Sequence, residues 1–369
     1  MAATDFGALS AARKKLWAAE IWAAGRDMSF WDKNGFIGKG NTSVVQRITD
    51  LTPTERGDEC VMQLVADLQG DGVVGDNILE GAEEAMYNDA VSIHVDQMRH
   101  GVRSKGTMAE QRTVVRFRST GKEKLGFWFS DKVDELMFLT AAGIAYSSKL
   151  DGSTRVSSQL PSLSFAADIV APSSGRLRYA NTATSTTTLA TTDKLTWNFV
   201  VQMQAYAKRK RMKAIRSGGK DYYCLLLSTE QMRDLKSDAT YQTNVGRAAN
   251  RGDSNPLFNN AVAVIDSCVI YDHNKVPNTL GLASGSKWGA GGTVDGAQAL
   301  LLGAQALGFA QVMAMQYEES DNTDYKNRPG MGVSRMLGML KPQFTSLTDA
   351  GTKQDFSVIS LYTAAGAIQ

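Results

Sequence analysis

The sequence predicts an α+β protein in which a long helix follows an extended β-hairpin and precedes a mixed α/β block. Across residues 107–144, large apolar residues such as Leu125 and Trp128 recur at helical spacing, and charged residues fall between them. One apolar face and one charged face are typical of an amphipathic helix packed on a core. Residues 59–105 alternate in the manner of two strands around a glycine-rich tip. Strands and helices then mix in residues 151–298.

The long helix is expected to cover residues 108–142, about 50 Å at 1.5 Å per residue. Gly143 follows it and supplies a left-handed stop. Gly121 and Gly126 lie inside it and lower its helical propensity. We therefore expect a bend or a break near residues 119–121.

Residues 1–58 are predicted to form an N-terminal arm. A short helix carries Trp17 and Trp22, and Phe30 and Trp31 follow among polar residues. So many large aromatic side chains cannot be buried within so short a segment. We expect them to dock on the main body of the chain or on another copy of it, since aromatic side chains often anchor interfaces.

The hairpin predicted at residues 59–105 changes charge along its length. Its middle is acidic and the residues just beyond it are basic: Glu80, Glu83 and Glu84, then Arg99, Arg103 and Lys105. A long two-stranded hairpin is marginally stable by itself in water. The pattern therefore favours a hairpin that lies on a neighbouring subunit and pairs its charges there.

The second half of the chain is predicted to be mixed α/β. Residues 149–192 are rich in Ser and Thr and indicate a loop or an ordered surface segment. Residues 195–216 predict a second helix with a basic end, and residues 221–228 a buried strand. Ser228 then caps a short helix. The chain thus divides into an arm (1–58), a hairpin loop (59–105), a spine-helix domain (106–150), an α/β block (151–298) and return strands (299–369).

Composition excludes several classes of protein. A hydrophobic content of 43% and a charged content of 21% are those of a folded chain. The net charge of +2 argues against a tight nucleic-acid binder. The three cysteines are widely spaced, which indicates reduced thiols. No apolar run approaches the length of a membrane span, and the first residues lack the pattern of a signal peptide.

No convincing active site emerges from the sequence, so we predict no catalytic residues, no cofactor and no metal. The strongest metal candidate is His94, Asp96 and His100, which share one face of a strand. A hydrogen-bonded structural role is the alternative that we favour for them. The basic cluster at 208–216 is expected to be a solvated helix end, with contact to phosphate as the alternative.

Short motifs along the chain, taken together, resemble one family. They are Gly57-Asp-Glu-Cys-Val-Met-Gln-Leu, Leu79-Glu-Gly-Ala-Glu-Glu-Ala, His94-Val-Asp-Gln-Met-Arg-His-Gly-Val-Arg, Met108-Ala-Glu-Gln-Arg-Thr, Met232-Arg-Asp-Leu-Lys-Ser-Asp-Ala, Asn255-Pro-Leu-Phe, Val269-Ile-Tyr-Asp-His-Asn-Lys-Val-Pro, Ala299-Leu-Leu-Leu-Gly-Ala-Gln-Ala and Asp324-Tyr-Lys-Asn. Their order is similar to that of the N4-type major capsid proteins of tailed bacteriophages, from about residue 16 to residue 365. The likeness is thin at 149–192.

This resemblance implies the HK97 fold, with an N-terminal arm, an extended hairpin loop, a peripheral domain on a spine helix, and an α/β axial domain. It also implies pentamers and hexamers of an icosahedral head around double-stranded DNA, made in the host cytoplasm. Scaffolding, decoration and portal proteins are the further partners it suggests. The subunit-interface residues that we expect are those of the arm and the hairpin: Trp17, Trp22, Phe30, Trp31, Glu80, Glu83, Glu84, Arg99, Arg103 and Lys105. The alternative is an encapsulin-like nanocompartment shell of the same fold.

Overall fold

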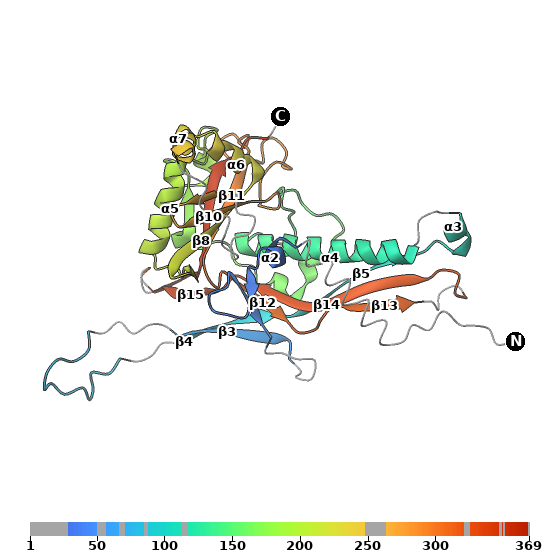
Figure 1. Cartoon of the computed structure of the whole chain (residues 1–369), viewed down its shortest axis with the longest axis horizontal. Coiled ribbons are helices and arrows are strands. Elements are labelled where there is room, and N and C mark those ends of the chain that lie inside the picture. Colours follow the sequence, from blue (N-terminus) through green and yellow to red (C-terminus); the bar gives the residue numbers. More distant parts are fainter. Residues whose placement is uncertain are drawn as a thin grey trace.

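The computed structural model of the chain describes residues 29–49, 57–65, 71–84, 88–112, 117–247, 263–320, 325–346, 349 and 351–367. Figure 1 shows a long helix, α4, that lies over one sheet. An α/β unit with a second sheet lies above one end of α4, and a hairpin, β3–β4, extends away from the two sheets. The α+β class predicted from the sequence is confirmed.

The spine helix is shorter than predicted and has no break at residues 119–121. Helix α3 spans Thr107–Gln111 and helix α4 spans Phe117–Ala142. The predicted break is wrong because the packing of Gly121 outweighs its weak helical propensity. A Cβ on Gly121 would lie 2.7 Å from Met331 Sδ and 3.3 Å from a methyl group of Val102. The glycine therefore lets the sheet approach the helix closely.

The predicted stop at Gly143 is confirmed. Gly143 has a φ of +69°, and a Cβ there would lie 2.5 Å from the carbonyl oxygen of Val170. Its N–H donates to Thr140 O at 3.1 Å, and the N–H of Ile144 donates to Leu139 O at 2.9 Å. This pair of bonds is a Schellman motif, which satisfies carbonyls at the helix end.

The peripheral sheet packs against α4. Its strands are β1 (Ile37–Gly38), β2 (Val45–Ile48), β12 (Leu307–Gln311), β14 (Gly330–Leu340), β13 (Gln316–Ser320) and β5 (Asp96–Arg103). They follow the order β1-β2-β12-β14-β13, and β5 pairs with the other edge of β14. Buried and half-buried residues alternate along the first part of β14, as expected of a strand with one face on a core.

The axial sheet has seven strands in the order β6-β17-β11-β8-β10-β9, with β7 also paired to β8. Their bounds are β6 (Leu177–Tyr179), β17 (Val358–Ala364), β11 (Gly296–Leu302), β8 (Lys220–Leu227), β10 (Cys268–Asp272), β9 (Ala263–Ile265) and β7 (Ile215–Ser217). The helices of this unit are α5 (Trp197–Arg209), α6 (Thr229–Lys236) and α7 (Ala239–Arg247). The helix predicted at 195–216 therefore ends early, because Arg211 adopts a φ of +51° and the chain turns into β7.

The second half of β8 is buried on both faces, which explains the unbroken apolar run there. Leu225 and Leu227 belong to a cluster with α5 and α6. Cys224 and Leu226, at the alternate positions, belong to the main core with α4. A strand covered on both faces has no position that needs to be polar. The buried strand and its Ser228-capped helix were both predicted correctly.

The Ser/Thr-rich stretch at 149–192 is an ordered surface segment, which was one of its two predicted forms. It contains short 3₁₀ turns: η1 (Leu160–Ser162), η2 (Ser164–Ala166), η3 (Ser174–Arg176) and η4 (Thr186–Thr188). Phe165 fixes it to the core, fully buried against the ring of Tyr146 at 5.8 Å. A small sheet of β15 (Gln343–Ser346) and β16 (Thr352–Asp355) lies beside η3.

His273 lies where the arm, the spine helix and the axial sheet meet. Its ring stacks on Phe138 at 5.3 Å and lies 4.5 Å from the ring of Phe30. Burial, and to a smaller extent the charge of Lys275, lower the pKa of His273 from 6.5 to about 4, while the charge of Asp131 opposes the shift. Because the folded pKa is below the unfolded one, this contribution to stability is full above pH 6.5 and is lost as the pH falls toward 4.

We expect His273→Phe to reduce the acid sensitivity of the subunit. Phenylalanine keeps a ring against Phe138 but cannot gain a proton. The drop in melting temperature between pH 7 and pH 5 should be smaller in the variant than in the wild type. His100→Phe is the control, because His100 stacks on Trp128 away from this junction. Equal drops in the wild type and the His273 variant would show that protonation of His273 does not contribute to the acid sensitivity.

Candidate intersubunit surfaces

The hairpin predicted at 59–105 is confirmed for its first two strands. Strand β3 (Glu59–Val65) pairs antiparallel with β4 (Asn88–His94), with Cys60 opposite Ile93. Its base packs on the body through a small apolar cluster: Ile48, Cys60, Met62, Ile93, Ala310, Leu340 and Phe344. After Val95 the chain leaves the hairpin, and β5 joins the peripheral sheet.

The basic residues predicted beside the hairpin therefore belong to the peripheral sheet. Arg99 and Arg103 lie on β5, opposite Ser334 and Gly330 of β14, and Lys105 follows that strand. The prediction that the hairpin continues to residue 105 is therefore wrong. The apolar positions change from odd numbers (Val91, Ile93, Val95) to even numbers (Met98, Val102) at residues 96–97, where the chain changes sheets, and this shift is the sequence signal that was missed.

The loop at the end of the hairpin, residues 71–84, projects far from the rest of the molecule (Figure 1). Three of its aliphatic side chains are exposed: Val74 by 77%, Ile78 by 78% and Leu79 by 58%. The loop has local order, since Gly81 N donates to Glu83 Oε2 at 2.7 Å and Asn77 Nδ2 donates to Val74 O at 2.6 Å. Exposed apolar side chains gathered on one projecting loop favour a binding surface.

This loop is also strongly acidic. It carries carboxylates and no Lys or Arg: Asp71, Asp76, Glu80, Glu83 and Glu84. Glu80, Glu83 and Glu84 are all exposed. We call residues 71–84 the acidic loop.

The opposite end of the molecule is basic. Strand β5 runs toward α3 there, away from the acidic loop (Figure 1). Exposed cations gather on β5, on the start of α4 and on the turn before β14: Arg99, Arg103, Lys105, Arg118, Lys124, Lys326 and Arg328. In the described parts of these segments and of β13, the cations outnumber the acids, which are Asp96, Glu123, Glu318 and Glu319. We call this set of cations the basic end.

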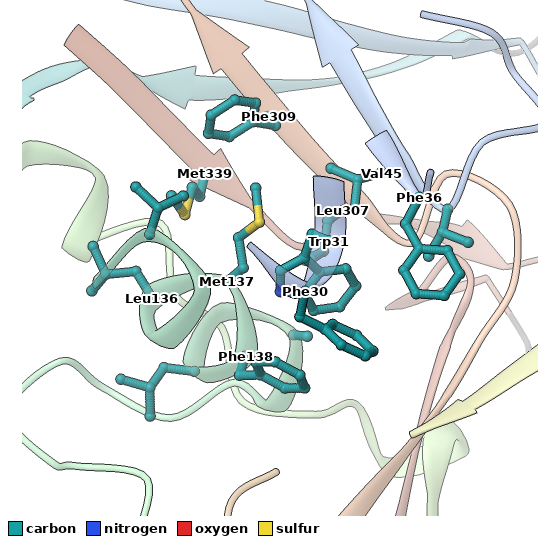
Figure 2. Packing of buried hydrophobic residues seen from close by; sticks show 14 of the residues in the cluster. Phe30, Trp31, Phe36, Val45, Leu136, Met137, Phe138, Leu307, Phe309 and Met339 are labelled. Atoms are coloured by element: carbon teal, nitrogen blue, oxygen red, sulfur yellow. The ribbon is translucent and has the colours of Figure 1, made fainter. Parts of the chain in front are cut away.

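Phe30 and Trp31 are buried in the core of their own chain (Figure 2). Helix α2 (Phe30–Lys33) places the ring of Trp31 5.0 Å from that of Phe138. Of the two expectations for these aromatic residues, docking on the main body is confirmed, and the assignment of these two to a subunit interface is wrong. Trp17 and Trp22 lie outside the described residues.

A buried carboxylate on the spine helix fastens this part of the arm. Asp134 Oδ1 accepts from Ser29 Oγ and Asp134 Oδ2 accepts from the N–H of Phe30, both at 2.7 Å. Burial raises the pKa of Asp134, and the two hydrogen bonds oppose that shift. The sequence does not single out Asp134, because its charge matches the other charges on the polar face of the helix.

The three candidate metal ligands do not converge. His94 Nδ1 lies 2.6 Å from Asp168 Oδ1, and Asp96 Oδ2 accepts from the N–H of Ser164 at 2.8 Å. His100 stacks on Trp128 at 4.1 Å. Within the described ranges, no group of three His, Cys, Asp or Glu side chains is arranged to hold a metal ion. In the same ranges no helix is both long and apolar enough to cross a bilayer.

Comparison with known proteins identifies the family. A model of the phage capsid protein family matches residues 2–367. The major capsid protein of Pseudomonas phage KPP25 is 41% identical over 372 residues, covering 98% of each chain. The chain belongs to the phage capsid protein family. It is a major capsid protein, a structural component of the phage head shell and not an enzyme.

Solved capsids share the fold of this capsid protein. The capsid of Ralstonia phage GP4 superposes with a TM-score of 0.78 at 28% identity, covering 93% of each chain. The capsid of cyanophage Pam1 gives a TM-score of 0.68 at 18% identity, covering 90% of this chain and 92% of that one. The HK97-like fold predicted from the resemblance is confirmed. The N4-type subfamily stays a prediction.

Proposed function

We propose that copies of this capsid protein join head to tail, with the acidic loop of one copy docked on the basic end of the next. Rings of five and six copies then make up an icosahedral shell that encloses double-stranded DNA. The observation that supports this arrangement is the placement of two complementary surfaces at opposite ends of one chain. Such contacts are heterologous, and they close into rings when the rotation between copies permits it.

The acidic loop supplies both the energy and the selectivity of this contact. Burying an aliphatic side chain such as Ile78 or Leu79 is worth about 1.5–3 kcal/mol. The carboxylates of the loop and the cations of the basic end add steering and select the partner surface. The acidic loop projects from the body of its own chain and leaves its apolar side chains exposed, so we infer that they pack against a neighbouring copy.

The remaining partners follow from the shell. We infer that packaged DNA contacts the inner surface without sequence preference, since the net charge of +2 supplies no strong basic surplus. Scaffolding, decoration and portal proteins are candidate partners of the assembled head. Synthesis in the host cytoplasm followed by incorporation into the virion is the proposed route. A cargo-enclosing nanocompartment has no observation in its favour.

Charge reversal of the acidic loop tests the contact. We expect Glu80→Lys/Glu83→Lys/Glu84→Lys to block assembly without changing the melting temperature, because these side chains are exposed and now face like charges. Arg99→Glu/Arg103→Glu/Lys105→Glu should block assembly for the same reason. Electron microscopy and sedimentation of assembly reactions give the readout.

The decisive variant carries both sets of substitutions in one chain. Complementarity is then restored with the signs exchanged, so particles should form again. Normal heads from either single set would rule out the proposed contact. Failure of the combined variant, with folding intact, would show that the two surfaces do not meet each other.

A further inference from the structure

The ring of His94 lies between two carboxylates from different parts of the chain. Its Nδ1 is 2.6 Å from Asp168 Oδ1, just after turn η2, and its Nε2 is 3.3 Å from Glu59 Oε1 on the partner strand β3. Glu59 and His94 are opposite each other in the hairpin register. Three segments therefore meet at one imidazole: both hairpin strands and the surface segment of the body.

Only the protonated ring satisfies both contacts. A neutral imidazole has one N–H and one lone pair, whereas the imidazolium donates from both nitrogens. If neutral His94 donates to Asp168, its remaining lone pair faces the Glu59 carboxylate. The geometry thus favours the protonated ring, which can donate a hydrogen bond to each of the two carboxylates.

The charges around the ring act in the same direction. The hydrogen bond to Asp168 and the charge of Asp168 are the main causes that raise the pKa of His94 above 6.5; burial opposes them, and the charges of Glu59 and Asp58 add smaller upward effects. A group whose pKa is raised in the folded state stabilises fully below its unfolded pKa. This contribution is lost as the pH rises above 6.5 and passes the folded pKa.

The same contact fastens the base of the hairpin to the body. The backbone N–H of His94 donates to Asp168 Oδ2 at 2.9 Å, and Asp96 holds Ser164 at the other end of η2. Farther out on β4, Asp89 Oδ2 accepts from the N–H of Thr345 at 3.0 Å. Histidine is the side-chain type whose ordinary pKa lies near neutral pH, so His94 is the attachment that can respond to pH there.

We propose that His94 is a pH-dependent latch that holds the hairpin against the body of the capsid protein. With the proton bound, the ring bridges Asp168 and Glu59 and fixes the direction in which the acidic loop projects. Without it, the bridge to Glu59 is lost and the base of the hairpin loosens. The latch stands on contacts within one chain. Its effect on shell assembly rests on the proposed function.

Hydrogen exchange of the unassembled full-length subunit tests the latch. Peptides covering β3 and β4 should exchange about two- to fivefold faster at pH 9 than at pH 6, after correction for the intrinsic rate, as fits one partly exposed ion pair. In His94→Gln the fast rate should appear at both pH values. In His94→Arg, which stays charged and can donate to both carboxylates, the slow rate should persist at both.

The matched control is His100→Gln, because His100 lies on β5, the next strand along the chain, and stacks on Trp128 instead of contacting the hairpin carboxylates. This variant should keep the wild-type pH response. A wild-type hairpin with equal corrected rates at pH 6 and pH 9 overturns the proposal, and so does a response that His94→Gln leaves intact. Because the subunit is unassembled, either result is independent of the charge-reversal test of the shell contact.

Discussion

Replacing Lys341 by methionine is expected to lower the free energy of unfolding by about 3–5 kcal/mol, as when one partner of a buried ion pair is removed. Lys341 Nζ lies 3.0 Å from Asp355 Oδ2, and both side chains are 0% exposed. Asp355 also accepts from Gln343 Nε2 at 2.7 Å and from the N–H of Ser173 at 3.2 Å. Methionine fills most of the space of the lysine but leaves the carboxylate buried without its cation. Urea unfolding of the subunit measures the loss.

Two further variants separate the charge from the packing. Lys341→Met/Asp355→Asn should recover part of the stability, because no unpaired charge stays buried. Arg216→Ala removes a surface ion pair with Asp221, whose arginine is 77% exposed, and should cost at most about 1 kcal/mol. If the buried and the surface substitution cost the same, the Lys341–Asp355 pair does not contribute the stability expected of a buried ion pair.

Truncation of Trp31 to alanine is also expected to cost about 3–5 kcal/mol, as in other deletions of a large buried aromatic side chain. Trp31 is 0% exposed and packs against Phe138 and Phe36. The loss should appear in the unassembled subunit, as a lower melting temperature, because the residue lies in its own core.

Val74→Ala is the comparison variant, with the opposite expected effects on stability and assembly. Val74 is exposed in the acidic loop, so its truncation should change the stability of the subunit by no more than about 0.5 kcal/mol and should weaken assembly instead. A Trp31→Ala subunit with unchanged melting temperature and failed assembly would restore the original assignment of Trp31 to a neighbour.

Local sequence signals were sufficient where the deciding contacts are local. Gly143 ends the helix through its own backbone conformation, and β8 shows its burial as an apolar run. The acidic loop was found because charge and glycine content cluster along the chain. Each of these features depends on neighbours within a few residues.

The rest depends on contacts between residues far apart in sequence. Gly121 is kept in the helix by Met331, and Asp134 finds its partners about a hundred residues upstream. His94 meets Asp168 across 74 positions. Alternation and helical periodicity report which face is buried but not which segment covers it. For the same reason, the aromatic content of the arm could not distinguish its own core from a neighbouring subunit.

The last strands of the chain complete both sheets. Strand β14 joins β5, β12 and β13, and β17 lies between β11 and β6. During synthesis, which proceeds from the N-terminus, neither sheet can close until these strands have left the ribosome. Nascent chains would therefore present an acidic loop without a folded surface to receive its neighbour. Under the proposed contact between copies, ring growth would start only from finished subunits, so the order of translation would keep partly made chains out of the shell.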